Sequence, residues 1–331
     1  MRRVSLGRGG PSVGAVGLGF WQAGSRLWGS SGVGPERVRA VLEEAQASGI
    51  DFIDTAEVYG WGSSERLLGE ALRRFNPSDF VVASKVAGFR ASRRDVYSGA
   101  ESIRRRLRGR LDLIQHHWPP PLWSDLCGVV RGLEDAVKAG LAGYYGFSNY
   151  GEGLLEEALE CSRRIDPVSD QVQYSLAYRA PEWGLASLLE SRGMRLIAWS
   201  PLAKGALAGL REPRAPAQRG DPFFRAAASN EALQRALARV ASRLGATKAQ
   251  VALAWLISRR ALPIPGTLNP ARVREYAGAA AIELGEEDLK LLDEASRKHL
   301  HEWGRRYDLL DRARLVPGTL QRLALALVRG I

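Results

Sequence analysis

Short apolar runs alternate with amphipathic helical runs along almost the whole chain, and this alternation constrains the fold more than any other feature. Several of the short runs are almost entirely apolar, which is typical of parallel strands buried on both faces. The β-like runs are 15–20, 51–55, 80–85, 111–117, 143–148, 170–174, 195–200 and 261–266. The helical runs between and after them are 35–49, 63–75, 94–109, 125–139, 152–163, 183–192, 229–243, 248–258 and 270–278.

Such an alternation predicts an α/β fold in which helices connect parallel strands. Eight units spread over ~280 residues fit a (β/α)8 TIM barrel better than an open sheet. No internal repeat and no Pro/Gly/Ser-rich linker divides the chain. We therefore predict a single domain, with the barrel at 1–298 and a C-terminal extension at 299–331.

The glycine-rich beginning, "GRGGPSVGAVGLGFWQAG", invites comparison with a dinucleotide-binding loop. No G-x-G-x-x-G opens a helix there, and no acidic residue follows at the distance that such a loop requires. The glycines instead predict an N-terminal β-hairpin and a tight turn into the first barrel strand.

Two segments depart from a minimal barrel. Residues 201–228 form a long interval rich in Pro, Gly, Ala and Arg, which we expect to be a functional loop. Residues 319–329 form a short basic amphipathic helix. Such a helix can lie on a membrane surface or bind a partner, or it can pack on the barrel. We expect packing on the barrel, because the apolar stretch is so short.

The composition excludes several classes of function. The formal charge is +11, but acidic residues are interleaved with the basic ones, so we expect no nucleic-acid partner. Cys127 and Cys161 lie in helical stretches outside any CxxC, so we expect neither a disulfide framework nor a metal site. No apolar signal core and no run of ~18 apolar residues occurs. We therefore expect a cytoplasmic protein with no membrane span.

Polar residues gather at the ends of three neighbouring strands. Asp54 ends the second strand and Tyr59 follows it, Lys85 ends the third strand, and His117 ends the fourth. Active sites of (β/α)8 barrels lie at the C-terminal ends of the strands. Any one of these residues alone would be unremarkable at a strand end. The presence of all four on one rim predicts an active site.

A chemical role can be assigned to each of these groups. Asp54 would pair with Lys85 and orient it. The charge of Lys85 would make Tyr59 more acidic, although burial opposes that shift. Tyr59 could then give a proton to a carbonyl oxygen, while a neutral histidine donates a hydrogen bond to the same oxygen. The set suits reduction of a C=O group but contains no hydride source, so it requires a redox cofactor.

The chain resembles the aldo-keto reductases over nearly all of residues 1–298. The matching stretches occur in family order and are "DFIDTAEVYGWGSSERLLGEAL" (51–72), "VVASK" (81–85), "LDLIQHHWP" (111–119), "GFSN" (146–149), "DQVQYSL" (170–176), "IAWSPLAKGAL" (197–207) and "PIPGTLNPARV" (263–273). The resemblance implies that Asp54, Tyr59, Lys85 and His117 are the catalytic tetrad. It places the catalytic histidine directly before Trp-Pro. Adjacent strand residues point to opposite faces, so His116 would face the helices.

The resemblance also implies a nicotinamide cofactor, and we expect NADPH rather than NADH. The residues implied near the nicotinamide are Phe20, Trp21, Asp54, Ser148, Asn149, Gln171 and Trp199, the last of which replaces the usual tyrosine. The start of the loop that holds the pyrophosphate corresponds to Ser200, Leu202 and Lys204. Contacts with the 2′-phosphate correspond to Thr267 and Arg272, with Arg274 as an additional candidate. The family often has a basic residue where this chain has Gly266, and Tyr276 replaces an asparagine near the adenine.

The substrate would be a small carbonyl compound, and the sequence indicates neither its identity nor an oligomeric state. Aromatic residues in the loops, Trp61, Trp118 and Trp28, are candidates for the pocket wall. Two other functions stay open. Lys85 could form a Schiff base in a lyase, which would not need Tyr59 or the set that binds the carboxamide. Some proteins similar to this family act as nicotinamide-sensing regulatory partners, but an intact tetrad argues against that role.

Overall fold

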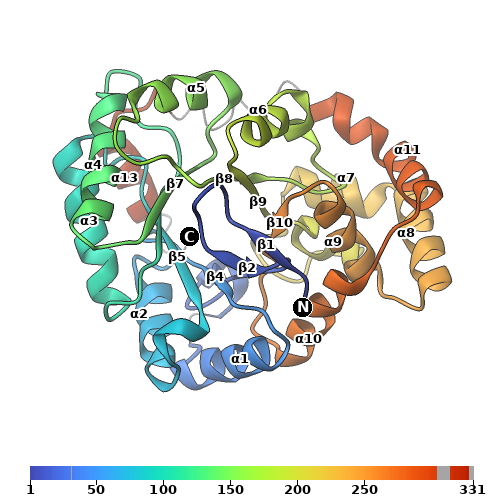
Figure 1. The fold of residues 1–331 in the computed structure, drawn as a ribbon. Helices are drawn as coiled ribbons and strands as arrows, with labels where there is room; N and C mark the ends of the chain where they lie inside the picture. The colour runs from blue at the N-terminus through green and yellow to red at the C-terminus, as the bar shows by residue number, and fades with distance from the viewer. Residues whose placement is uncertain (31, 304–313, 328–331) are drawn as a thin grey trace.

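The computed structural model describes residues 1–30, 32–303 and 314–327 and contains a (β/α)8 barrel (Figure 1). Its eight parallel strands pair in sequence order, and a further bridge between Gly19 and Gly266 brings the first and last together. The predicted fold class is therefore confirmed. The strands are β3 (Leu18–Gly19), β4 (Phe52–Asp54), β5 (Val81–Val86), β6 (Leu113–His116), β7 (Tyr144–Ser148), β8 (Ser169–Gln173), β9 (Arg195–Trp199) and β10 (Leu262–Pro263).

Helices surround the barrel, and local signals in the sequence set several of their ends. Pro35 occupies the first turn of α1, where its missing N–H costs nothing. Asp125 caps α4 through the Gly128 amide, and Thr247 begins a capping box at α9. The helices that follow the strands are α1 (Pro35–Ala47), α2 (Ser63–Ala71), α3 (Arg93–Arg106), α4 (Leu126–Lys138), α5 (Glu152–Cys161), α6 (Leu185–Ser191), α8 (Glu231–Leu244), α9 (Lys248–Ser258), α10 (Pro270–Gly278) and α11 (Glu286–Trp303).

The predicted hairpin closes one end of the barrel. It consists of β1 (Arg3–Ser5) and β2 (Ser12–Gly14) and lies across the front of the barrel in Figure 1. Leu6 and Val13 are fully buried in one cluster with Phe52 and Leu113, which lie at the beginnings of their strands. The hairpin therefore plugs the N-terminal ends of the strands and leaves the C-terminal ends for the site.

The interval 201–228 is more ordered than its composition suggests. It contains a 3-10 turn at Ala203–Ala208 and leads into the helix α7 (Pro222–Ser229). Asp221 accepts a hydrogen bond from the Phe224 amide, and Pro222 stands in the first turn, so the start of α7 carries two ordinary helix signals. The expectation of one long loop is corrected to the 3-10 turn and the start of α7, joined by a loop at 209–221.

The last described element is α13 (Gly318–Leu327), close to the predicted helix 319–329, whose final two residues lie outside the described ones. In Figure 1 it is the faded red helix behind the barrel, at the end away from the hairpin. The Trp118 indole donates to Gln321 Oε1 at 3.0 Å, and the Leu122 amide donates to the carbonyl oxygen of Arg314. The predicted extension also includes 304–313 and 328–331, which lie outside the described residues.

The two cysteines are joined, so the expectation of no disulfide is wrong. Cys127 in α4 and Cys161 in α5 form a disulfide with their Cα atoms 4.9 Å apart. Neighbouring helices of a barrel pack side by side, and this packing brings together two positions that are 34 residues apart. Spacing rules for metal sites do not detect such a pair. The two cysteines therefore give no support to the expectation of a cytoplasmic protein.

Over the described residues, no helix is both long and apolar enough to pass through a bilayer.

Reduction of the Cys127–Cys161 bond should lower the free energy of unfolding by up to about 4 kcal/mol, because the bond restricts the unfolded chain over a 34-residue separation. Urea denaturation with and without dithiothreitol measures the change. The double variant Cys127→Ser/Cys161→Ser is the control and should unfold near the midpoint of the reduced protein, whatever the reductant. Equal midpoints for the oxidised and reduced wild-type protein would contradict this expectation.

Candidate active site

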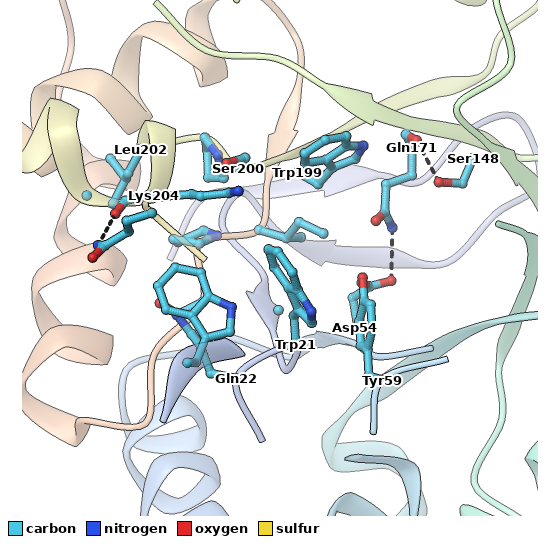
Figure 2. Close-up of a pocket in the computed structure, with 18 of the residues that line it drawn as sticks. Trp21, Gln22, Asp54, Tyr59, Ser148, Gln171, Trp199, Ser200, Leu202 and Lys204 are labelled. Carbon is cyan, nitrogen blue, oxygen red and sulfur yellow. Dashed lines mark hydrogen bonds between the residues drawn. The ribbon is translucent and has the colours of Figure 1, made fainter. Parts of the chain in front are cut away.

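A cavity of about 930 Å³ opens among the loops that follow the strands (Figure 2). Ser148, Gln171 and Trp199 lie on one side of the view, and Trp21, Asp54 and Tyr59 lie on the other. Predicted site residues that line this cavity are Trp21, Asp54, Tyr59, His117, Trp118, Ser148, Asn149, Gln171, Trp199, Ser200, Leu202, Lys204 and Arg272. The barrel therefore brings together most of the positions that the sequence singled out.

A buried ion pair lies beside the cavity. Lys85 Nζ is 2.5 Å from Asp54 Oδ1 and also donates to the carbonyl oxygen of Thr55 at 2.9 Å. Both side chains are almost wholly buried, because β4 and β5 are neighbouring parallel strands that carry them into the barrel. The ammonium lies 5.2 Å from the centroid of the Tyr59 ring. Asp54, Lys85 and Tyr59 thus form one cluster.

The protonation of this cluster follows from burial and from the charges in it. Burial lowers the pKa of Lys85, but the negative charge of Asp54, with a smaller contribution from the interaction with Tyr59, outweighs that effect and the pKa is raised. The charge of Lys85 lowers the pKa of Tyr59, as expected, but burial raises that pKa by more. The expectation that Tyr59 is more acidic than a free tyrosine is therefore corrected. The lysine stays charged and the phenol stays protonated at neutral pH.

The two adjacent histidines lie in different surroundings, as strand alternation predicts. His116 Nδ1 is 2.8 Å from the Tyr150 hydroxyl and its Nε2 is 3.2 Å from the carbonyl oxygen of Arg90. Burial lowers the pKa of His116 to about 4. His117 lines the cavity, and its ring centroid is 5.7 Å from that of Tyr59. Burial, reinforced by Lys85, holds the pKa of His117 well below its usual value, so the ring is neutral.

The second carboxylate oxygen of Asp54 is held by amides from inside the barrel. Asp54 Oδ2 accepts from Gln171 Nε2 at 2.9 Å and from Gln115 Nε2 at 3.4 Å. Sequence reasoning did not single out Gln115. The sequence did contain a signal for Gln115, because it shares one face of β6 with Leu113 and His117. A glutamine that is fully buried on this face needs hydrogen-bond partners inside the barrel.

The predicted nicotinamide-binding residues also interact with one another. Ser148 Oγ donates to the carbonyl oxygen of Gln171 at 2.8 Å, and Asn149 Nδ2 donates to the carbonyl oxygen of His117 at 2.9 Å. The Trp199 indole donates to Asn149 Oδ1 at 2.9 Å. Asn149 has a φ of 62°, a left-handed conformation that asparagine tolerates. The amide groups are thus fixed before any ligand binds.

Three basic residues, Lys204, Arg214 and Arg272, line the cavity. Among the described lining residues the one carboxylate is Asp54, which is paired with Lys85. Lys204 Nζ is 2.5 Å from Asp221 Oδ2 and donates to the carbonyl oxygen of Ala217. It therefore joins the 3-10 turn to the loop before α7. Sequence reasoning missed Arg214, which lies in a stretch with no motif.

Some predicted site residues lie elsewhere. The side chain of Phe20 is buried in the core rather than at the cavity, and Thr267 is not in the cavity lining. Trp61 is partly exposed and stacks on Phe89 outside the lining. Arg274 makes two hydrogen bonds to Glu44 of α1 and is not in the cavity lining.

Gln22 is a lining residue that the sequence did not reveal. Its Nε2 donates to the carbonyl oxygen of Gly266 at 3.2 Å, and a Cβ at position 266 would come within 2.5 Å of its Oε1. Gln22 thus fills the space that a side chain at position 266 would occupy. Gln22 Oε1 and the indole N–H groups of Trp21 and Trp28 are buried without hydrogen-bond partners, so polar groups remain free along the wall.

Among the described residues, no cluster of His, Cys, Asp and Glu side chains could hold a metal ion.

Comparisons with known proteins agree with this geometry. An uncharacterized oxidoreductase of Mycobacterium tuberculosis is 35% identical over 297 residues, which cover 86% of this chain and 90% of that protein. The chloroplastic pyridoxal reductase of Arabidopsis thaliana is 31% identical over 87% of this chain and 84% of its own.

Solved structures resemble the chain as well. A thermostable aldo-keto reductase in complex with the inhibitor epalrestat has a TM-score of 0.77 and 33% identity, covering 89% of this chain and 100% of that one. An aldo/keto reductase from Klebsiella pneumoniae in complex with NADP and acetate has a TM-score of 0.73 and 26% identity, covering 89% and 95%. The model of the Aldo/keto reductase family matches residues 15–297, and the chain belongs to this family.

Proposed function

We propose that the protein reduces aldehydes or ketones to alcohols, with NADPH as the hydride donor and Tyr59 as the general acid. The observation that carries the proposal is the buried Asp54–Lys85 pair beside a protonated Tyr59 and a neutral His117, at a cavity that Lys204, Arg214 and Arg272 also line. A proton donor, a hydrogen-bond donor and a site for an anionic dinucleotide therefore occur in one cavity.

The four side chains suit a carbonyl oxygen that gains negative charge. Tyr59 supplies the proton, because its phenol is protonated at neutral pH and faces the cavity. A neutral His117 ring carries one N–H and can donate it to the same oxygen. Lys85 stays positive and stabilises the phenolate that remains after proton transfer, and Asp54 orients Lys85. Exclusion of water strengthens each of these interactions.

The residues fit a nicotinamide dinucleotide. Bound NADPH would supply the hydride. Ser148, Asn149 and Gln171 would hold its carboxamide, and Trp199 would offer an aromatic face to the ring. Lys204 and Arg214 would neutralise the phosphates, and Gln22 Oε1 could accept a hydrogen bond from a ribose hydroxyl.

Two other functions receive less support from the site. A Schiff base requires a neutral lysine, whereas Lys85 is held charged by Asp54 and does not line the cavity. A Schizosaccharomyces pombe relative, 30% identical, is named a putative voltage-gated potassium channel subunit beta. A regulatory role of that kind would not need the complete proton-donating cluster that this chain retains.

Replacement of Tyr59 by phenylalanine should lower kcat for carbonyl reduction at least about a hundredfold, because the proton donor is lost. The affinity for NADPH should change little, since the ring and its packing against Trp21 remain. Turnover of a panel of aldehydes and ketones, followed by NADPH absorbance, and a fluorescence titration of NADPH measure the two effects. Turnover equal to that of the wild type would exclude Tyr59 as the acid.

The rate of reduction should be constant across neutral pH and fall only above about pH 10. The acid must be protonated, so the rate falls as pH rises through the pKa of Tyr59, which burial places above its ordinary value of 10.0. No change is expected near pH 6.5, because burial keeps the pKa of His117 well below that value. Measurement of kcat from about pH 5 to about pH 11 checks both the constant rate near neutral pH and the fall at high pH. A fall between pH 7 and 9 would contradict the assignment.

Arg272→Ala should weaken NADPH binding by about tenfold or more and leave NADH binding nearly unchanged, because only NADPH has a 2′-phosphate for the guanidinium. Arg272 now pairs with Glu275 at 3.0 Å and must exchange that partner for the phosphate. Arg274→Ala is a matched control that should affect neither cofactor, since Arg274 is bound to Glu44. Equal losses for NADPH and NADH in Arg272→Ala would refute the assignment.

A further inference from the structure

Helix α13 turns Gln321 toward the barrel, whereas Leu320 and Leu323 face solvent. Gln321 is buried and accepts a hydrogen bond from the Trp118 indole, and Ala324 lines the cavity. Leu320 and Leu323 are 51% and 55% exposed. A helix that merely packs on a domain has the opposite arrangement, with leucines inside. The expectation that this helix simply packs on the barrel does not explain its outer face.

Other apolar residues continue this outer face. The Leu122 amide donates to the carbonyl oxygen of Arg314, which places the loop after β6 beside the residues that precede α13. Nine large hydrophobic side chains are exposed among the described residues, and six of them belong to these two segments. We call these six the apolar rim; they are Leu122, Trp123, Leu315, Val316, Leu320 and Leu323. Clustered exposed apolar surface of this kind marks an interaction site.

The charges near the apolar rim indicate which kind of surface the rim can bind. From Arg314 to Leu327, the described part of this segment contains two arginines, Arg314 and Arg322, and no acidic residue. Arg322 is exposed on α13, between Leu320 and Leu323. The carboxylate nearest in sequence to Trp123 is Asp125, which caps α4 and pairs with Arg131. The rim is therefore apolar with cationic flanks, and it complements an anionic surface.

The composition of the rim favours a lipid surface over a protein partner. Leucines and a tryptophan with neighbouring arginines are typical of helices that lie in the interface of a bilayer. Leucine is under-represented among the residues that dominate protein–protein binding. A second copy of this chain is disfavoured by repulsion between two molecules that each carry a charge of +11.

We propose that α13 and the loop 117–124 dock the protein on a membrane surface that contains anionic phospholipid. Leu320, Leu323 and Trp123 insert into the interface, and the exposed Arg322 contacts the headgroups. Val316, Gln321 and Ala324 belong to the same segment and line the cavity, so the docked protein holds one wall of its cavity at the membrane. This proposal goes beyond the reductase activity and does not depend on it.

Sedimentation of the full chain with vesicles tests the proposal. The protein should bind vesicles of equimolar phosphatidylcholine and phosphatidylglycerol at low salt. Binding should be weaker at high salt and weaker to pure phosphatidylcholine, because part of the attraction is electrostatic. No binding to the anionic vesicles would overturn the proposal.

A matched pair of variants separates the rim from general charge effects. Leu320→Asp/Leu323→Asp should lower the affinity for anionic vesicles at least about tenfold, since the inserted side chains are lost. Ala232→Asp/Ala238→Asp changes the net charge equally at exposed positions of α8, on the other side of the barrel in Figure 1, and should lose much less. Thermal unfolding checks that both variants fold.

Two results would overturn the proposal in specific ways. The first is equal loss of vesicle binding in the two double variants, which would show a charge effect without a docking site. The second is a wild-type dimer in sedimentation equilibrium that Leu320→Asp/Leu323→Asp converts to a monomer, which would show that a second copy covers the rim.

Discussion

The ion pair between Lys85 and Asp54 is the interaction on which the rest of the site depends. Two opposite charges from neighbouring strands lie inside the barrel and are almost wholly buried. Removal of either partner would leave an uncompensated charge in a dry interior, which is far more costly than loss of a surface pair. The pair therefore requires a polar surrounding, which Thr55, Gln115 and Gln171 supply. The apolar plug at the opposite end, with Leu6 and Val13, provides the stability that this polar end cannot.

The same burial has opposite consequences for different groups in the cluster. Lys85 keeps its charge because Asp54 is within 2.5 Å, and this compensation exceeds the cost of desolvation. Lys85 only partly offsets the effect of burial on Tyr59 and reinforces it on His117, so both groups are held in their neutral forms. The result is one fixed positive charge beside two neutral donors. This distribution suits stabilisation of an oxyanion, and it opposes a lysine that must lose its proton to act as a nucleophile.

The barrel and the cluster of Asp54, Tyr59 and Lys85 could be predicted because both depend on local patterns. Alternating apolar and amphipathic runs determine the strands and helices, and parallel strands must present their C-terminal residues on one rim. The disulfide between Cys127 and Cys161 could not be predicted in this way, since it results from the packing of α4 against α5. Gln22 escaped notice for a similar reason, because its partner Gly266 is 244 positions away and only barrel closure brings them together.

The direction of the Tyr59 pKa shift and the orientation of α13 both depend on which side chains are buried. The amino-acid sequence does not reveal this directly. A basic amphipathic pattern predicts that one face of a helix is covered, but not which face. In α13 the covered position is Gln321, held by Trp118 next to His117. The described contact that fixes the helix to the cavity is thus polar, and Leu320 and Leu323 stay available for another surface. Because Val316 and Ala324 of this segment line the cavity, a surface that covers these two leucines would lie next to one wall of the cavity.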